Sequence, residues 1–578
     1  MKRIIAENGK SCYHIVTSQF ADEGELFAAS QLKEYIYKSA NAVIPYFSDR
    51  CEKRGAEIRI GRNVREHIEN VSMLCDEGFR VFTDGEDIVI TGKTPRGVIY
   101  GVFRFLELTI NYRCFTKNLE NYSCSDVIAV DEIDLYENPS FEYRDVYFRG
   151  AFDCDFAVKN RLNSSLALIP QEKGGKLKFY NFHHSFYDIL PPDIYFDEHP
   201  EYFSEVDGVR LRNRGQLCLT NENAISEAVR RVKEWIKARP DCKVFSVAQN
   251  DWQNYCTCSK CREMDDREGS HSGTVIYFVN RIAQEIEKEY PDVLIHTFAY
   301  QYSKRAPKYI KPRNNVIVRL CNIECTWDES IYSQFVHKPD SASAEFVRNI
   351  ADWSHICKHL YIWDYACNFS FYILPFPNYY VLSENMKYYK KSKVAGVLQQ
   401  GNFSYGDASG LADLETYIAA KLLWNADADV KILIDEFTNG CYGSAAKYMR
   451  EYIDLLCNTV KGHHLRLYYS PDAEFITDNL VEQAEVLFGK ALRAVDSEEI
   501  RNRIKKEYLS VRFMRISRLP LDFVGRQVLI DTLYDDIKKN RITEIQERRN
   551  IEISFKNLSN SRYCTEKDGN YSLYYIMK

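Results

Sequence analysis

The chain has 578 residues, which is too many for one hydrophobic core, so two to four domains are expected. Hydrophobic residues make up 45% and charged residues 27%, the composition of an ordinary globular protein. The net charge is −6 and no basic stripe stands out, which argues against nucleic acid as the main partner.

The sequence predicts a cytoplasmic protein without a membrane segment. Met1–Asn8 is not followed by a long apolar stretch, and no apolar run approaches the ~20 residues that span a bilayer. The 18 cysteines are scattered through a large chain, which is typical of reduced, buried thiols. Assembly as a homo-oligomer stays open.

Residues 1–135 are predicted to form a separate small domain that mixes helices and strands. Helical periodicity covers residues 28–37, and a second helix over residues 98–108 follows the start signal Thr94-Pro-Arg-Gly97. Residues 57–61 predict a strand. Residues 78–92 predict a hairpin, because two β-type runs flank Asp84-Gly85.

Residues 136–410 contain a ladder of short apolar runs, most of them separated by helix-like stretches. Each run ends in carboxylates, amides or aromatic residues, as in Val244–Asp251, Leu294–Gln301, Val316–Glu324, Leu360–Asp364 and Val394–Gln400. Earlier strands are expected at Phe141–Arg149 and near Phe179–Phe186. This spacing predicts a TIM (β/α)8-type barrel whose strand ends converge on one face. Residues 191–214 are expected to be a long loop over that face, followed by a helix at Asn223–Lys237.

Residues 411–578 are predicted to form a helical C-terminal domain packed on the barrel. A 3.6-residue periodicity runs through residues 429–442, 445–460, 478–495 and 498–518.

Several motifs resemble known families. Thr94-Pro-Arg-Gly-Val-Ile-Tyr-Gly101 resembles the small domain that precedes the barrel in glycoside hydrolase families 20 and 67. Six further motifs are similar to the domain-of-unknown-function family 4838, which is common in bacterial carbohydrate-use loci: His199–Phe203, Gly215–Thr220, Ser246–Asp251, Cys256–Cys261, Tyr361–Tyr365 and Pro375–Pro377. The resemblance implies a small domain, a barrel and a helical domain, with glycosidase-like chemistry and no assigned sugar.

One motif departs from that family. The eighth-strand motif often reads Glu-Gln-Gly in the family, whereas this chain has Gln399-Gln400-Gly401. If that glutamate were essential in relatives, this chain would differ in specificity or activity.

Three expected strand ends carry an acid, namely Asp251, Glu324 and Asp364, and two mechanisms could use them. In hexosaminidases that employ the substrate's own acetamido group, Asn250 would hold that group and Asp251 would be the general acid, with retention. In family 67, an acid in the place of Asp251 faces later carboxylates, here Glu324 and Asp364, which would activate water and invert the configuration. The adjacent Asn-Asp pair favours retention, although Asp251 could also merely cap a turn.

Further residues are candidates for substrate binding. Trp252, Tyr300, Trp363 and Tyr365 accompany the acids and could stack on a sugar ring or pack in the core. Arg144 and His184 come from the first two strand ends and could bind hydroxyl groups or a carboxylate, as could Gln400 on the last strand. Arg144 could equally be part of the barrel structure.

Cys256, Cys258 and Cys261 follow the Asp251 strand with a spacing that can reach one tetrahedral zinc ion. A fourth ligand would come from elsewhere, with Cys218, Cys321 and Cys325 as candidates. Reduced loop thiols are the alternative. A catalytic metal is disfavoured because soft thiolates suit hard oxygen chemistry poorly, and no cofactor is expected for catalysis.

The combined expectation is an exo-acting glycoside hydrolase that releases a terminal N-acetylhexosamine or uronic acid from an oligosaccharide. The alternative is a non-catalytic carbohydrate-binding barrel, and Gln399 is the residue that favours it.

Overall fold

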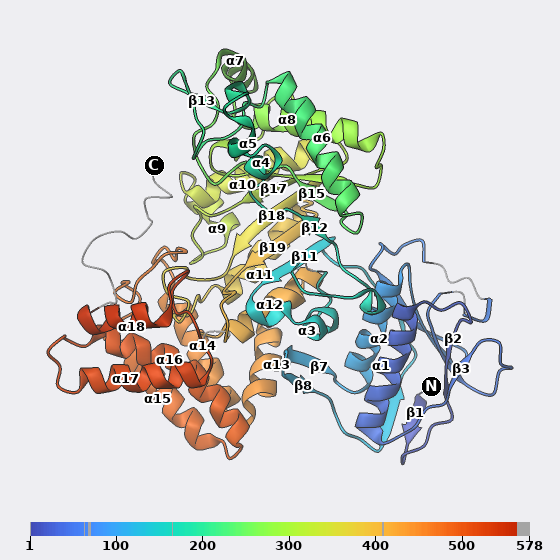
Figure 1. Cartoon of the computed structure of the whole chain (residues 1–578). Coiled ribbons are helices and arrows are strands. Elements are labelled where there is room, and N and C mark those ends of the chain that lie inside the picture. The colour runs from blue at the N-terminus through green and yellow to red at the C-terminus, as the bar shows by residue number, and fades with distance from the viewer. Residues whose placement is uncertain (1, 63, 67–70, 164–165, 407–409, 563–578) are drawn as a thin grey trace.

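The protein is described by a computed structural model that covers residues 2–62, 64–66, 71–163, 166–406 and 410–562. Figure 1 shows three regions: the N-terminal domain in blue at the right, a central parallel sheet with its helices, and a group of helices in orange and red at the lower left. No helix in the described ranges is both long and apolar enough to cross a membrane.

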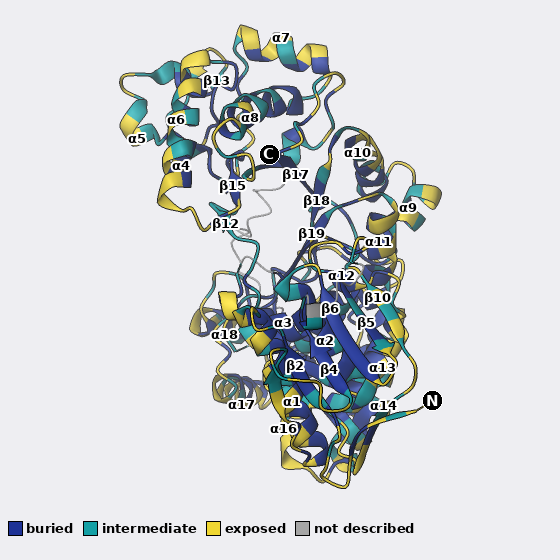
Figure 2. Cartoon of the chain, turned by 90° about the vertical axis from the view of Figure 1, so that its right-hand side faces the viewer, coloured by how far each residue is buried: buried dark blue, intermediate teal, exposed yellow. Residues whose placement is uncertain are grey.

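The N-terminal domain is built on a six-stranded sheet in the order β10-β5-β6-β4-β2-β3, with α1 and α2 packed side by side. Its inner strands β2, β4 and β6 are mostly buried, as their dark ribbons in Figure 2 show, whereas the edge strands β3 and β10 are partly exposed. Its elements are β1 (Arg3–Glu7), β2 (His14–Thr17), α1 (Glu23–Ala40), β3 (Tyr46–Ser48), β4 (Glu57–Ile60), β5 (Phe79–Asp84), β6 (Asp87–Gly92), α2 (Pro95–Thr109), β7 (Arg113–Thr116), β8 (Leu119–Asn121), β9 (Val127–Val130) and β10 (Asp134–Glu137).

The predicted elements of this domain are confirmed, and each has a local cause. Helix α1 begins at a capping box, in which Asp22 accepts from the Glu25 amide and Glu25 accepts from the Asp22 amide. Helix α2 begins with Pro95, whose missing amide hydrogen costs nothing in a first turn. Strands β5 and β6 are joined at Gly85, which has φ +60° as a tight hairpin turn requires.

The central sheet has seven strands in the described ranges, all parallel, in the order β11-β19-β18-β17-β16-β15-β12. The strands are β11 (Tyr143–Tyr147), β12 (Phe179–Tyr180), β15 (Val244–Ser246), β16 (Leu294–Ala299), β17 (Val316–Cys321), β18 (His359–Tyr365) and β19 (Gly396–Gln400). Strands β11 and β12 lie at opposite edges and do not pair. The predicted eight-stranded barrel is therefore confirmed in part, as a curled parallel sheet.

Helices cover the outer face of this sheet and separate most of its strands, as parallel connections require. The helices of this region are α3 (Cys154–Lys159), α4 (Phe186–Ile189), α5 (Pro192–Tyr195), α6 (Glu222–Ala238), α7 (Ser259–Glu268), α8 (Ser272–Glu287), α9 (Ile331–His337), α10 (Ala342–Ile356), α11 (Tyr379–Lys391) and α12 (Ala412–Trp424), of which α7 packs on α8. Residues 191–214, expected to be a loop, contain α5 and a small hairpin of β13 (Glu205–Val206) and β14 (Val209–Arg210).

Side chains alternate between the two faces of each strand. On β17, Ile317, Arg319 and Cys321 face the inside of the curled sheet, while Val318 and Leu320 pack toward the helices.

The C-terminal region is helical, as predicted. Its helices are α13 (Val430–Tyr442), α14 (Ala446–Thr459), α15 (Asp478–Ala494), α16 (Glu498–Arg518), α17 (Arg526–Lys539) and α18 (Ile551–Asn560). Helix α12 packs against β11, so this preceding helix belongs to the cover of the sheet.

Candidate active site at the carboxyl ends of the parallel strands

The mouth of the sheet, meaning the carboxyl ends of its strands and the residues that follow them, carries two of the predicted acids. Asp251 lies five residues beyond β15 and is exposed. The Tyr300 hydroxyl, from the end of the neighbouring β16, donates to Asp251 Oδ1 at 3.2 Å. Gln301 Nε2 donates in turn to the Tyr300 hydroxyl at 3.0 Å, so the carboxylate is oriented by a short polar chain.

Glu324 follows β17, the next strand along. Its side chain is 32% exposed, and Lys304 Nζ lies 3.9 Å from its carboxylate. Burial raises the pKa of Glu324, and this effect outweighs the lowering by the Lys304 ammonium group. Glu324 is thus an acid that holds its proton to a higher pH than an exposed glutamate.

The charges of Asp251 and Glu324 both affect the pKa values of two neighbouring side chains. The pKa of Tyr300 is raised by burial and further by the negative charges of both carboxylates. The pKa of the Cys321 thiol is likewise raised, mainly by burial, against the lowering effect of Arg319 and with smaller contributions from the same two charges. Since Tyr300 follows β16 and Cys321 ends β17, both carboxylates lie near the same part of the mouth.

A cluster of aromatic side chains lies next to Tyr300 and Cys321. Trp363 is half-buried, and its indole N–H donates to Gln400 Oε1 at 2.6 Å. The Phe182 and Phe298 rings each lie 5.8 Å from the Trp363 ring. The buried Arg319 guanidinium lies 5.7 Å below the same indole. Trp363 and Gln400, two candidates for substrate binding, are thus joined by a hydrogen bond, and the indole ring stays partly exposed.

Three other predicted residues also lie at the mouth. His184 Nδ1 contacts the Gln249 carbonyl at 2.6 Å, and its ring lies 6.2 Å from Tyr300. Trp252 is half-buried beneath the Arg214 guanidinium at 5.6 Å. Tyr365 is only 6% exposed, and its pKa is raised by burial and further by charges that include Glu324.

Asn250 is engaged elsewhere. Its side-chain nitrogen donates to the Gly215 carbonyl at 2.9 Å, and its side-chain oxygen accepts from the Tyr187 amide at 3.3 Å. Gln216 clamps the backbone here, accepting from the Asn250 amide and donating to the Asn250 and Trp252 carbonyls. With 6% exposure, Asn250 holds the loop and does not present its amide to the mouth.

Asp364 lies on the outer face of the sheet. It is fully buried, accepts from Asn322 at 2.6 Å, and also accepts from the Tyr389 hydroxyl of α11. Burial raises its pKa despite these hydrogen bonds. Gln399 pairs in register with Asp364 and shares that outer face. Neither residue reaches the mouth. The presence of Gln399 where the family often has glutamate therefore does not change the charge at the mouth.

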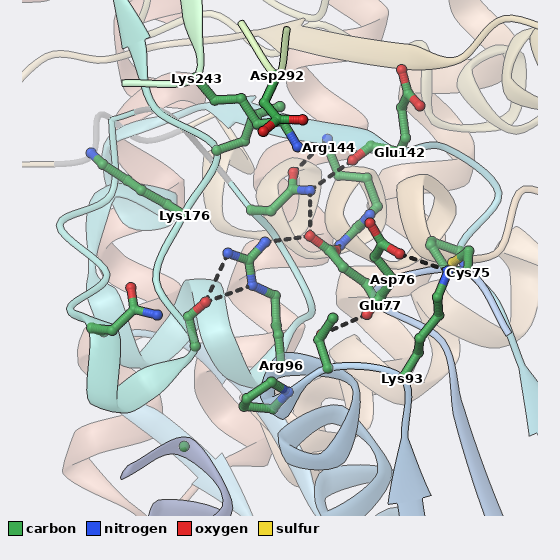
Figure 3. A pocket seen from close by; sticks show the side chains of 18 of the residues that line it. Cys75, Asp76, Glu77, Lys93, Arg96, Glu142, Arg144, Lys176, Lys243 and Asp292 are labelled. Atoms are coloured by element: carbon green, nitrogen blue, oxygen red, sulfur yellow. Dashed lines mark hydrogen bonds and ion pairs between the residues drawn. The ribbon is translucent and has the colours of Figure 1, made fainter. Parts of the chain in front are cut away.

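Arg144 also points outward, toward the N-terminal domain. Its fully buried guanidinium donates to Glu77 and to the Phe141 and Arg161 carbonyls. Figure 3 shows Glu77 between Arg144 and Arg96 in the wall of a cavity of about 980 Å³. This cavity lies at the amino ends of the strands, opposite the mouth, and Glu77 in its wall is paired with both Arg96 and Arg144. Arg144 thus connects β11 with the N-terminal part of the chain, away from the candidate acids.

The C-terminal region adds residues that sequence reasoning missed. The Phe369 amide, just after β18, donates to the Leu467 carbonyl at 2.8 Å, and the Glu547 amide donates to the Phe369 carbonyl at 3.1 Å. These contacts bring Tyr468 to the mouth, where its pKa is raised by burial and further by charges that include Glu547 and Asp251. No local pattern marks these positions, because the contacts span about a hundred residues or more.

The three predicted metal ligands do lie together. The sulfur atoms of Cys256, Cys258 and Cys261 form one group with that of Cys218, and all lie within 4.8 Å of one another. Cys321 and Cys325, the other candidates for the fourth position, belong to the end of β17. The cysteine cluster could hold a metal ion.

Three solved structures resemble the chain at low identity. A GH138 enzyme targeting pectin rhamnogalacturonan II has 10% identity and a TM-score of 0.44, with 91% of each chain covered. CpGH84B has 13% identity and a TM-score of 0.47, with 95% of this chain and 94% of that chain covered. The chitobiase of Flavobacterium johnsoniae has 11% identity and a TM-score of 0.43, with 93% and 96% covered. At such TM-scores the function has to be argued from the mouth itself.

No curated protein matches the chain. A family model described as "Domain of unknown function (DUF4838)" matches residues 114–454, more than half of the chain, and spans the whole parallel sheet. The chain therefore belongs to the DUF4838 family.

Proposed function

We propose that the protein is a glycoside hydrolase that removes a terminal sugar from an oligosaccharide, with Asp251 and Glu324 as its pair of carboxylates. The observation that carries this proposal is the placement of both acids near Tyr300, in the same cluster as the partly exposed Trp363 ring. Glycosidic cleavage needs one carboxyl group that donates a proton and a second that is charged. An aromatic face beside them suits the C–H surface of a sugar ring.

The environment assigns different roles to the two acids. Glu324 is the proton donor, because its burial raises its pKa. Asp251 is the base, because it is exposed to water and is oriented by the Tyr300 hydroxyl. This reverses the role that the sequence suggests for Asp251. Asp364 and Asn250 support the site from outside, and no cofactor takes part.

The spacing of the strands favours inversion. Strand β16 lies between β15 and β17, so the two strands that precede the acids are about 10 Å apart. Inverting enzymes need carboxyl groups about 6.5–9.5 Å apart to admit a water molecule. Substrate assistance loses its support because the Asn250 amide is bonded within the protein.

The stereochemistry of the first product tests this assignment. Proton NMR during early turnover is expected to reveal the inverted anomer, and rates are expected to be similar with and without an acetamido group. A retained first product would contradict the Asp251 and Glu324 roles and return the choice to a substrate-assisted or covalent route.

The pH profile tests the proton donor. Because Glu324 must be protonated, kcat/KM is expected to fall as the pH rises through its raised pKa. In Glu324→Gln this alkaline limb should disappear together with most of the activity. An unchanged limb in the residual activity of this variant would assign the titration to another group.

A panel of aryl glycosides that includes β-N-acetylhexosaminides and uronides separates hydrolysis from simple binding. Turnover of at least one member is the expected result, and Glu324→Gln should lose most of it on members whose aryl group leaves poorly without a proton. Binding of the sugars without any turnover would favour a carbohydrate-binding protein. The main sequence argument for that alternative is weakened, because Gln399 lies on the outer face of the sheet.

A further inference from the structure

The cysteine cluster has the dimensions of a metal centre. Cys218 Sγ lies 3.7 Å from Cys258 Sγ and 3.9 Å from Cys261 Sγ. In a tetrahedral zinc site with Zn–S bonds of ~2.3 Å, the sulfur atoms are separated by ~3.8 Å. A disulfide would need about 2.0 Å, and all four cysteines are free thiols. We propose that Cys218, Cys256, Cys258 and Cys261 bind one zinc ion in a closed, all-thiolate structural site.

The chain around the cluster is arranged as structural zinc sites require. Cys258 is the N-cap residue of α7, and Cys261 lies in its first turn, where the helix dipole favours negatively charged thiolates. The Glu205 amide donates to Cys256 Sγ at 3.3 Å, and the Thr220 hydroxyl lies 3.2 Å from Cys261 Sγ. Such contacts orient ligands and offset their charge.

A cation completes this surrounding shell. Arg210 of β14 donates from Nη1 to Cys256 Sγ at 3.7 Å and forms an ion pair with Glu205 at 3.1 Å. Four thiolates and one Zn²⁺ carry a net charge of −2, so a guanidinium beside them is favourable. Four thiolates also fill every position of a tetrahedral ion, which leaves none for a substrate.

The site joins two segments that meet at the mouth. Cys218 follows Gln216, which clamps the Asn250 and Trp252 backbone, and Cys256 follows Trp252 by four residues. The β13–β14 hairpin is held as well, because the Thr257 amide donates to the Glu205 carbonyl at 2.7 Å. Zinc at one end and the Gln216 clamp at the other would therefore hold the loop that carries Asp251.

The test is metal content in the full-length protein, so it does not depend on the proposed glycosidase activity. Protein purified without chelators is expected to contain one zinc per chain by elemental analysis. Cys258→Ser, which alters the one half-exposed ligand, should lose most of this zinc. The matched control is Cys242→Ser, a buried free cysteine outside the cluster, which should keep it.

Cobalt provides a readout that does not depend on how well the variants fold. Wild-type protein stripped of metal and titrated with Co²⁺ should show sulfur-to-cobalt charge transfer and tetrahedral d–d bands that saturate at one ion per chain. Absence of zinc together with absence of these bands would overturn the proposal, as would full zinc content in Cys258→Ser.

Discussion

Asp251→Asn is expected to lower the turnover of an unactivated glycoside by roughly 10²–10⁴-fold, the range for loss of a general acid or base. The thermal midpoint should stay near that of the wild type. Asp251 is exposed, and an asparagine oxygen can still accept the Tyr300 hydrogen bond. The matched control is Asp266→Asn, an exposed aspartate on α7, which should retain wild-type turnover.

The nature of the leaving group separates the two roles. A variant that lacks the proton donor should recover much of its rate on substrates whose leaving group needs no proton, whereas a variant that lacks the base should not. Glu324→Gln is therefore expected to be rescued by a dinitrophenyl glycoside and Asp251→Asn is not. The reverse pattern would make Asp251 the acid, and near-normal turnover of Asp251→Asn would remove it from catalysis.

Most helices and strands could be predicted, because the sequence signals that specify them lie within a few neighbouring residues. A helix start such as the Asp22 capping box and a turn such as Asp84-Gly85 lie within a few residues. The closure of the sheet depends instead on pairing between distant strands. Strand β12 contains only two residues, and its edge is not paired with β11, which no periodicity in the sequence reveals.

The candidate site was harder to predict than the helices and strands, because its membership depends on which face of the sheet each side chain occupies. Trp363 and Asp364 are consecutive on β18, so only one of them can face the inside of the sheet. The inner face belongs to Trp363, and Asp364 bonds outward to Tyr389 of α11. Strand alternation alone could have excluded one of the pair. Tyr468 differs, since its contacts at the mouth lie far away in the sequence and only the fold brings it there. For the fourth ligand of the cysteine cluster the sequence offers three candidates, and the fold selects Cys218.

Glu77→Gln is expected to cause the largest loss of stability, because it leaves two arginines without their counter-charge. Arg144 is fully buried and Arg96 is 14% exposed, and both contact the Glu77 carboxylate. Breaking a buried ion pair from one side costs roughly 3–5 kcal/mol in the free energy of unfolding. Chemical denaturation at pH 7 would measure the loss. The neighbouring Asp76→Asn is the matched control, since Asp76 pairs with Lys93 at the surface and should be nearly neutral.

The pH dependence of this effect identifies its cause. Burial alone would raise the pKa of Glu77, but the Arg144 and Arg96 guanidinium groups lower it to about 2. An unfolded glutamate titrates near ~4.3. Because the folded pKa is the lower one, the stabilisation is complete above pH ~4.3 and is lost as the pH falls toward 2. The difference in the free energy of unfolding between wild type and Glu77→Gln should therefore be constant from pH 7 to 5 and become smaller below pH ~4.3. A gap that stays constant at low pH would mean that the variant is destabilised by altered packing and not by the loss of charge between the N-terminal domain and the sheet.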